Sequence, residues 1–168
     1  MDKSDRLVPP GFSLQKELKM SAGFVGGAAL VLILGFFLSY MAGVEGMYSY
    51  VSGRRVETPH AVFPACRTML IPGAVAFILS SAAFLWMLFR HISYHYRGGS
   101  RCIYTMRRLP RKSELAVRCG TLPVFGLLAS QLSWRLLVLA CGGIYMGLTP
   151  DRWLAADAWE QIIHLVTH

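Results

Sequence analysis

Few residues in this chain have the types and spacing that chemistry requires. Gln131 and Arg135 lie one helical turn apart in a stretch that is otherwise apolar. A charged residue in such a stretch usually faces the interior of a helix bundle or an aqueous path. Two interpretations stay open for Arg135. It contacts an anionic substrate or an acid of another subunit, or it is satisfied locally at a packed interface or by snorkelling if the helix shifts.

Histidines and cysteines give weaker signals. His91 and His95 have a spacing that can bind a metal on a helix, but no Cys, Asp or Glu lies nearby in the sequence to complete a site. Tyr94 and Tyr96 favour headgroup contact at a membrane interface instead. The four cysteines, Cys66, Cys102, Cys119 and Cys141, form no CxxC pair. The sequence therefore predicts no catalytic residue, disulfide framework, metal site or cofactor.

The basic segment 90–121 is the most informative part of the chain. It carries eight of the 17 Lys and Arg residues and a single acid, Glu114. Within it, Gly98-Gly99 and Pro110 bound a short helix that Ser100 can cap. From charge alone, the segment is a juxtamembrane loop that sets orientation or binds anionic lipid.

The order of residues in this segment also resembles a known family. A short helix, then Leu109-Pro110-Arg111-Lys112-Ser113-Glu114, then an apolar stretch is similar to the coupling-helix region of ABC-2-type transporter permeases. The typical pattern there is Leu-Pro, two variable residues, Arg, one variable residue and Glu, which is one residue longer. The likeness covers about residues 12–148.

This resemblance implies a permease subunit that docks on a cytoplasmic ATPase and assembles with another permease chain. The docking residues would be Arg101, Tyr104, Arg107, Arg108, Leu109, Pro110, Arg111 and Glu114. Because the sequence contains no P-loop, the chain does not hydrolyse ATP by that route itself.

Three apolar segments must position these residues. Segments 23–43, 71–89 and 122–148 contain one charged residue, Arg135. Hydrophobic residues make up 54% of the 168 residues and charged residues 15%, whereas soluble domains carry about 25% charged residues. Runs of about 20 apolar residues match the thickness of a bilayer. The sequence predicts an all-α integral membrane protein with three transmembrane helices in a membrane domain 12–148.

The flanking residues are more polar. Residues 1–11 predict a flexible tail, and Ser13 can cap a short interfacial helix with Leu14 and Leu18 on one face, although these residues can also be the start of the first span. Residues 149–168 predict an amphipathic interfacial helix that is too charged for a fourth span. No β pattern of useful length is present.

Small residues recur at helical spacing within the predicted spans. They are Gly35, Ser39 and Gly43; Gly73, Ala76, Ser80 and Ala83; Gly126, Ser130 and Ser133; and Ala140, Gly143 and Gly147. Because small residues let helices approach closely in lipid, these positions predict packing faces within the chain or against partner subunits.

The distribution of basic residues predicts the orientation. Most of the Lys and Arg residues fall in 1–22 and 90–121, whereas 44–70 and the tail carry few. The positive-inside bias then places the N-terminus in the cytoplasm and the C-terminus outside, in the plasma membrane. This bias also explains the net charge of +8 without a nucleic-acid partner.

Three functions follow as hypotheses. The first is a small transmembrane subunit of an ABC-type transporter, a homo- or hetero-oligomer that couples a cytoplasmic ATPase to the membrane helices through residues 100–115. The alternative is a structural or regulatory subunit of a larger membrane complex. The third is a lipid-interacting or sensory anchor that uses the basic segment.

Overall fold

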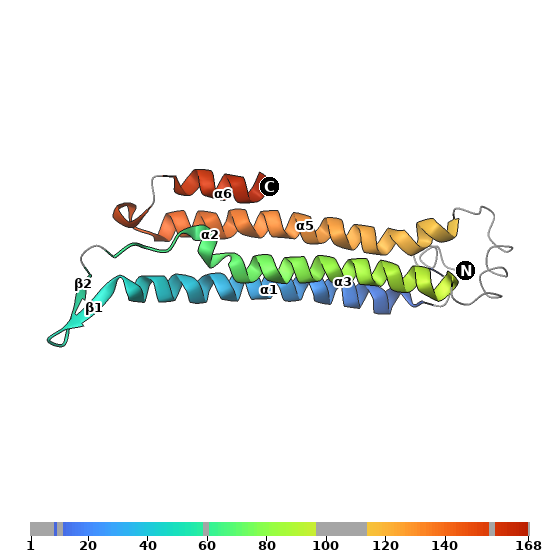
Figure 1. The fold of residues 1–168 in the computed structure, drawn as a ribbon, viewed down its shortest axis with the longest axis horizontal. Helices are drawn as coiled ribbons and strands as arrows, with labels where there is room; N and C mark the ends of the chain where they lie inside the picture. Colours follow the sequence, from blue (N-terminus) through green and yellow to red (C-terminus); the bar gives the residue numbers. More distant parts are fainter. Residues whose placement is uncertain (1–8, 10–11, 59–60, 97–113, 155–156, 168) are drawn as a thin grey trace. The chain divides into compact units, whose positions relative to one another are not determined.

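Three long helices make up most of the structure. The computed structural model describes residues 9, 12–58, 61–96, 114–154 and 157–167. The long helices are α1 (Leu14–Gly46), α3 (Ile71–Tyr96) and α5 (Glu114–Leu148) (Figure 1). Each is long and apolar enough to cross a membrane, because at about 1.5 Å per residue each exceeds the roughly 30 Å of hydrocarbon. The chain is a multi-pass membrane protein, and the predicted fold class is confirmed.

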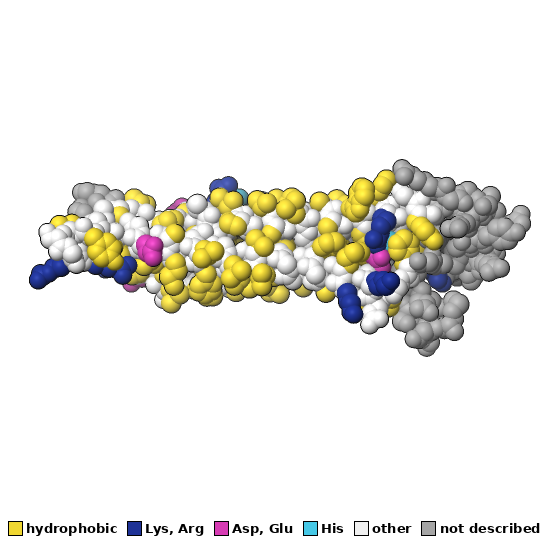
Figure 2. Space-filling view, turned by 90° about the horizontal axis from the view of Figure 1, so that it is seen from below, with side chains coloured by type: hydrophobic (Ala, Val, Ile, Leu, Met, Phe, Trp, Pro, Cys, Tyr) yellow, Lys and Arg dark blue, Asp and Glu magenta, His cyan; other side chains and the backbone are white. Residues whose placement is uncertain are grey.

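The outer surface of these helices is apolar. Figure 2 shows hydrophobic side chains spread over the helices on the face in view. Leu38 on α1, Ile78 on α3 and Phe125 on α5 expose 71%, 68% and 65% of their surface. Contiguous apolar exposure on this scale is rare on soluble monomers, but it is the favourable surface in a bilayer.

The start of α1 is continuous with the first span. Residues 14–22 are helical, as predicted, and they form the first turns of α1 without a break. The structure therefore matches the interpretation in which these residues begin the first span. Leu18 is exposed, whereas the preceding residue, Glu17, is buried, so this turn already packs against other parts of the chain.

The helices pack in two compact units, each containing parts of all three. Unit 1 holds residues 1–27 and 78–131, and unit 2 holds residues 28–77 and 132–168. In unit 1, the Phe24 ring on α1 stands edge-on to the Phe84 ring on α3, with 5.7 Å between centroids. Phe84 is fully buried, and a Cβ added at Gly126 on α5 would overlap its ring. The packing therefore requires a small residue at position 126, which is one of the positions predicted to form a packing face.

An aromatic cluster forms the core of unit 2. The Phe63 ring lies 5.6 Å from Tyr40 on α1, 5.9 Å from Tyr145 on α5 and 5.9 Å from Trp153 near the C-terminus, centroid to centroid. The Tyr145 hydroxyl donates a hydrogen bond of 3.2 Å to the Pro64 carbonyl. The cluster thus fixes the stretch before the short helix α2 (Cys66–Met69) against two long helices.

A β-hairpin follows α1. Strands β1 (Tyr48–Val51) and β2 (Arg54–Glu57) pair antiparallel, with Tyr48 opposite Glu57. Ser52 and Gly53 at the turn have φ of 51° and 78°, as a two-residue type I′ turn requires. The expectation that no β structure of useful length is present was wrong at this hairpin. Glu57 forms an ion pair with Arg152 in the 3-10 helix η2 (Asp151–Trp153).

The C-terminal helix packs on the chain itself. α6 (Ala158–Thr167) is amphipathic, as predicted. Its Ala158 and Ile162 are buried, and α6 lies alongside α5 (Figure 1). Ile162 sits against Gly142, where an added Cβ would lie 2.8 Å from the Ile162 Cγ2 atom. The apolar face of α6 therefore covers unit 2, whereas Trp159 and Ile163 stay exposed.

The Gly126 contact predicts a stability difference between two glycines on α5. Replacing Gly126→Ala should lower the free energy of unfolding in detergent by about 1–3 kcal/mol, because the new methyl group overlaps the Phe84 ring. Gly120→Ala is the control, since a Cβ there meets nothing within 4 Å. Thermal unfolding followed by intrinsic fluorescence measures both. Equal midpoints for the two variants would contradict this packing.

The predicted orientation can be measured with introduced cysteines. Burial raises the pKa of the Cys66 thiol to about 11, and maleimides react with the thiolate, so Cys66 should stay nearly unlabelled at neutral pH. Val62 is 89% exposed. Val62→Cys should therefore react with an impermeant maleimide on intact cells at least tenfold more than the wild-type chain.

Ser13→Cys, at an exposed position before α1, is the matched control for orientation. It should react only after the membrane is permeabilised. Labelling of Ser13→Cys but not Val62→Cys on intact cells would show that the chain is inserted the other way round.

Candidate functional site

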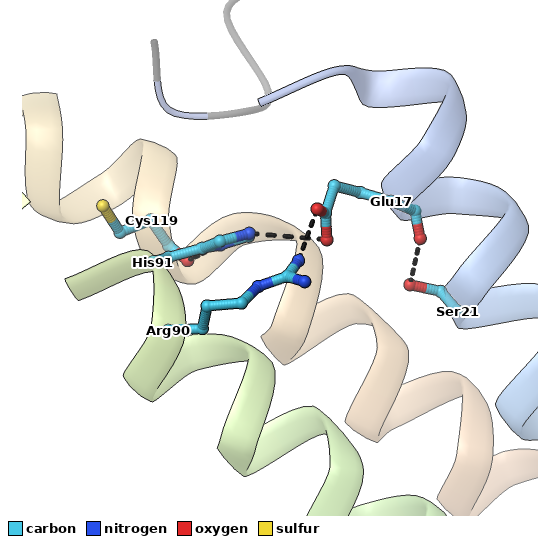
Figure 3. A network of polar contacts seen from close by, with 5 residues as sticks. All are labelled: Glu17, Ser21, Arg90, His91 and Cys119. Atoms are coloured by element: carbon cyan, nitrogen blue, oxygen red, sulfur yellow. Dashed lines mark hydrogen bonds and ion pairs between the residues drawn. The ribbon is translucent and has the colours of Figure 1, made fainter. Parts of the chain in front are cut away.

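A buried polar cluster joins α1, α3 and α5 in unit 1 (Figure 3). The Glu17 carboxylate on α1 accepts a hydrogen bond and forms an ion pair with the Arg90 guanidinium on α3. The next residue on α3, His91, places its Nε2 atom 3.5 Å from the second Glu17 oxygen. The Glu17 side chain is 6% exposed and the His91 side chain 0%. We call Glu17, Ser21, Arg90, His91 and the Cys119 carbonyl the polar cluster.

His91 connects the cluster to α5. Its Nδ1 atom lies 3.2 Å from the Cys119 carbonyl oxygen. Because a carbonyl only accepts, Nδ1 must donate in this contact. The Nε2 atom then attracts the Glu17 carboxylate only when it too carries a proton. The His91 ring therefore lies between the Glu17 carboxylate and the Cys119 carbonyl, and it links α1 to α5 through its two nitrogen atoms.

Aromatic residues cover the cluster. The Phe12 ring stands edge-on to His91 at 4.6 Å and to Tyr94 at 5.1 Å between centroids. The Arg90 guanidinium carbon lies 5.3 Å from the centre of the same Phe12 ring, a cation–π distance. Shielding from water strengthens the charge–charge attraction inside the cluster.

Helix ends explain why these residues meet. Glu17 lies in the first turn of α1, a favourable place for an acid next to the helix dipole. Arg90 and His91 lie in the last third of α3, at the end of the helix that packs beside the start of α1 in unit 1. Ser21 donates a hydrogen bond of 2.9 Å to the Glu17 backbone carbonyl. The burial of opposite charges is tolerable here because each charge has a partner.

Most of the residues predicted for partner binding lie outside the described residues. Arg101, Tyr104, Arg107, Arg108, Leu109, Pro110 and Arg111 all belong to that set. Glu114 is the first residue of α5, and its side chain is also outside the described part. The role of this segment therefore stays a prediction.

The two polar residues predicted inside the membrane have different surroundings. The Gln131 amide donates to the Ser81 hydroxyl at 3.5 Å in unit 1. Arg135 lies on an exposed face of α5 in unit 2. No hydrogen bond or ion pair joins Arg135 to any residue in the described parts of the chain. Within the described residues, Arg135 therefore has no local partner, and its role stays a prediction.

The polar cluster was not predicted from the sequence. The expectation that the residues around His91 contact headgroups was wrong for His91 itself, because its ring is completely buried. The search for a partner covered only residues near His91 in the sequence, whereas Glu17 pairs with Arg90 across 73 positions. A usable signal existed: the start of the first span and the end of the second lie on the same side of a membrane.

Unit 2 contains an open apolar groove of about 360 Å³. It lies between α1 and the stretch around α2, and its lining includes Ser39, Gly43, Pro64 and Thr68. Two hydroxyl groups are the only side-chain polar groups of this lining. The groove can accommodate an apolar group but offers no chemistry.

Comparison with known proteins adds no family to this geometry. No protein-family model, no curated protein and no solved structure matches the chain. The arrangement of the polar cluster must therefore be interpreted from its own chemistry. An acid held between two basic side chains, with a carbonyl as the fourth group, is suited to fastening three helices together.

The polar cluster predicts coupled effects of mutation. Arg90→Gln should lower the free energy of unfolding by about 1–3 kcal/mol, because it leaves the buried Glu17 carboxylate without its ion-pair partner. Glu17→Gln should have a smaller effect, because the Arg90 side chain that it leaves is partly exposed. The double variant should lose at least about 0.5 kcal/mol less than the sum. Unfolding in mixed micelles with increasing sodium dodecyl sulfate measures these energies.

Lys19→Gln is the matched control, because Lys19 is exposed on the same helix two residues beyond Glu17. Its effect should stay within about 0.5 kcal/mol. Strictly additive effects of the Glu17 and Arg90 substitutions would show that these side chains do not interact.

Proposed function

We propose that this chain is a small transmembrane subunit that couples a bound protein to its own three spans. The protein binds the predicted coupling residues 100–115, most of which lie in segment 97–113. The polar cluster is the observation that supports the proposal. Arg90 and His91 precede the segment by about two helical turns, and Cys119 follows it at a similar distance. Both ends of the segment are therefore fastened at one place, and Glu17 connects that place to α1.

This arrangement has a mechanical consequence. A force on segment 97–113 acts on the end of α3 and on the beginning of α5, which the segment joins. Because His91 contacts both the Cys119 carbonyl and Glu17, the three helix ends in unit 1 move together. Without the cluster, a force on α3 or α5 would not reach α1 through these side chains.

The finer proposal is that the bound protein is a cytoplasmic ATPase of an ABC-type transporter. Its support is the resemblance of residues 109–114 to the coupling region of ABC-2-type permeases, together with the order of the spans around it. On this proposal, closure of the ATPase pushes segment 97–113, and α3 and α5 tilt. Another permease chain would complete the transport path.

A second candidate function is a structural or regulatory subunit without a transport role. The exposed Arg135 on α5 favours it, because a charge on an outward face in the membrane requires an outside partner whether or not transport occurs. The two candidates differ in the importance of segment 97–113.

Neutralising the basic segment tests the coupling proposal. The ATPase activity that co-purifies with the chain from its native membranes should fall at least tenfold when the chain carries Arg107→Gln, Arg108→Gln and Arg111→Gln. The reason is that a protein docking on this segment must meet its guanidinium groups. The matched control replaces Arg54, Arg55 and Arg152, which lie in the hairpin and near the C-terminus.

Glu17→Gln separates docking from coupling. It should retain the bound ATPase but remove the change in ATP hydrolysis that the wild-type chain causes, because only the connection to α1 is lost. Wild-type preparations without ATPase activity would exclude the transporter proposal. Binding of the purified chain to anionic liposomes, abolished by the triple substitution, would then identify a lipid anchor.

A further inference from the structure

Helix α5 has two different faces in unit 2. On one face, Val138, Cys141 and Tyr145 are buried, with at most 4% of their surface exposed. On the opposite face, Leu132, Leu136 and Leu139 expose 60%, 59% and 42%. Arg135 and Gly143 lie on this exposed face, because their positions repeat at helical spacing. We call Leu132, Arg135, Leu136, Leu139 and Gly143 the outer α5 face.

Arg135 lies at the middle of the span. From Arg135 to Leu122 or to Leu148 the helix rises on the order of 20 Å in either direction, which is farther than an extended arginine side chain reaches. A guanidinium at the middle of the predicted span 122–148 therefore does not reach the headgroups on either side. Within the described residues it has no hydrogen-bond or ion-pair partner. A charge left in this position is unfavourable, and no described residue of this chain neutralises it, so a partner helix is the natural source of the counter-charge.

Glycines make the same face accessible to another helix. A Cβ added at Gly143 or at Gly147, one turn further on, would meet nothing within 4 Å. Gly126 and Gly142, by contrast, are filled by Phe84 and Ile162 of this chain. The glycines of the outer α5 face are thus small residues that the chain's own packing does not use. Small residues at this spacing let the backbone of a second helix approach closely in lipid.

The spans of a second copy of this chain do not supply the missing charge. The sequence has no Asp or Glu in residues 18–44, 58–113 or 115–150, and these ranges include the middle of every span. A lipid phosphate stays at the headgroup level, and a soluble anion does not enter hydrocarbon. A carboxylate carried by a transmembrane helix of another protein meets all of these conditions.

We propose that the outer α5 face binds a transmembrane helix of a different protein, and that this helix carries an Asp or Glu at the depth of Arg135. The ion pair forms away from water, where it is strong and specific. Leu132, Leu136 and Leu139 pack around it, and Gly143 permits the close approach. The proposal rests on the role of the chain as a subunit, but it concerns a surface separate from segment 97–113.

A synthetic helix of defined sequence tests the charge requirement. The full chain, labelled with a fluorophore, is reconstituted in phosphatidylcholine vesicles with a labelled peptide of 21 leucine and alanine residues that has a central Asp and lysines at both ends. Energy transfer should report association at least tenfold stronger than for the same peptide with a central Leu. The same peptide with a central Asn should associate more weakly than the Asp peptide, because Asn carries no charge.

Variants of the chain locate the effect. Arg135→Leu should abolish the preference for the Asp peptide, and Arg135→Lys should retain part of it. Since removing a charge from a span favours membrane insertion, loss of binding by Arg135→Leu cannot be attributed to failure to insert. Gly143→Ile should weaken binding of the Asp peptide, whereas Leu38→Ile on α1 should not. Equal association of the Asp and Leu peptides with the wild-type chain would overturn the proposal.

Cross-linking in the native membrane identifies the occupant. A photoreactive benzoylphenylalanine at position 139 should give a discrete product with another protein whose span contains a central Asp or Glu. The same group at position 38, which is also exposed to lipid, should not give that product. Products containing only a second copy of this chain, only lipid, or a protein without such an acid would each overturn the proposal.

Charge exchange completes the test and separates it from the coupling proposal. Arg135→Asp should lower the yield of the cross-linked product at least tenfold. Replacing the partner's acid by Arg should restore that yield. The triple substitution in segment 97–113 should leave this cross-link unchanged. If that triple substitution has no effect on ATPase co-purification either, the coupling proposal fails while the outer α5 face stands.

Discussion

The constraint on which this structure depends is the absence of water around the spans. In hydrocarbon a charged side chain has no solvent to stabilise it, so it must find a counter-charge or lie at the membrane surface. Arg90 follows this rule, because it lies near the end of α3 and pairs with Glu17. The rule also explains why apolar side chains cover the outer surface of the helices instead of forming a single buried core.

Close packing replaces the hydrophobic effect as the force between the helices. Lipid tails are as apolar as leucine, so burying apolar surface between helices gains little in itself. The chain instead uses shape: Phe84 fills the space above Gly126 in unit 1, and Leu32 fills the space above Gly73 in unit 2. The polar cluster then adds charge–charge attraction between α1 and α3 in unit 1. Such an attraction fixes the register of the two helices, which dispersion contacts alone would leave free to shift.

Composition predicted the spans because the membrane acts on each residue separately. A run of apolar residues such as 71–89 needs no knowledge of its neighbours to be assigned to a bilayer. The hairpin at Tyr48–Glu57 was not predicted, since its strands have only four residues each and β2 is mostly polar. The polar cluster was missed because it depends on which helix ends meet, which only the packing determines.

Arg90 and Arg135 show how the same side chain has different meanings at different depths. Arg90 has its acid within this chain, and its exposed part lies near the end of α3, where water or headgroups are available. Arg135 is midway along α5 on a face that the chain does not cover. On the proposal made for the outer α5 face, the outward position of Arg135 marks a surface that a helix of another protein completes, because a charge at this depth is stabilised only by a counter-charge.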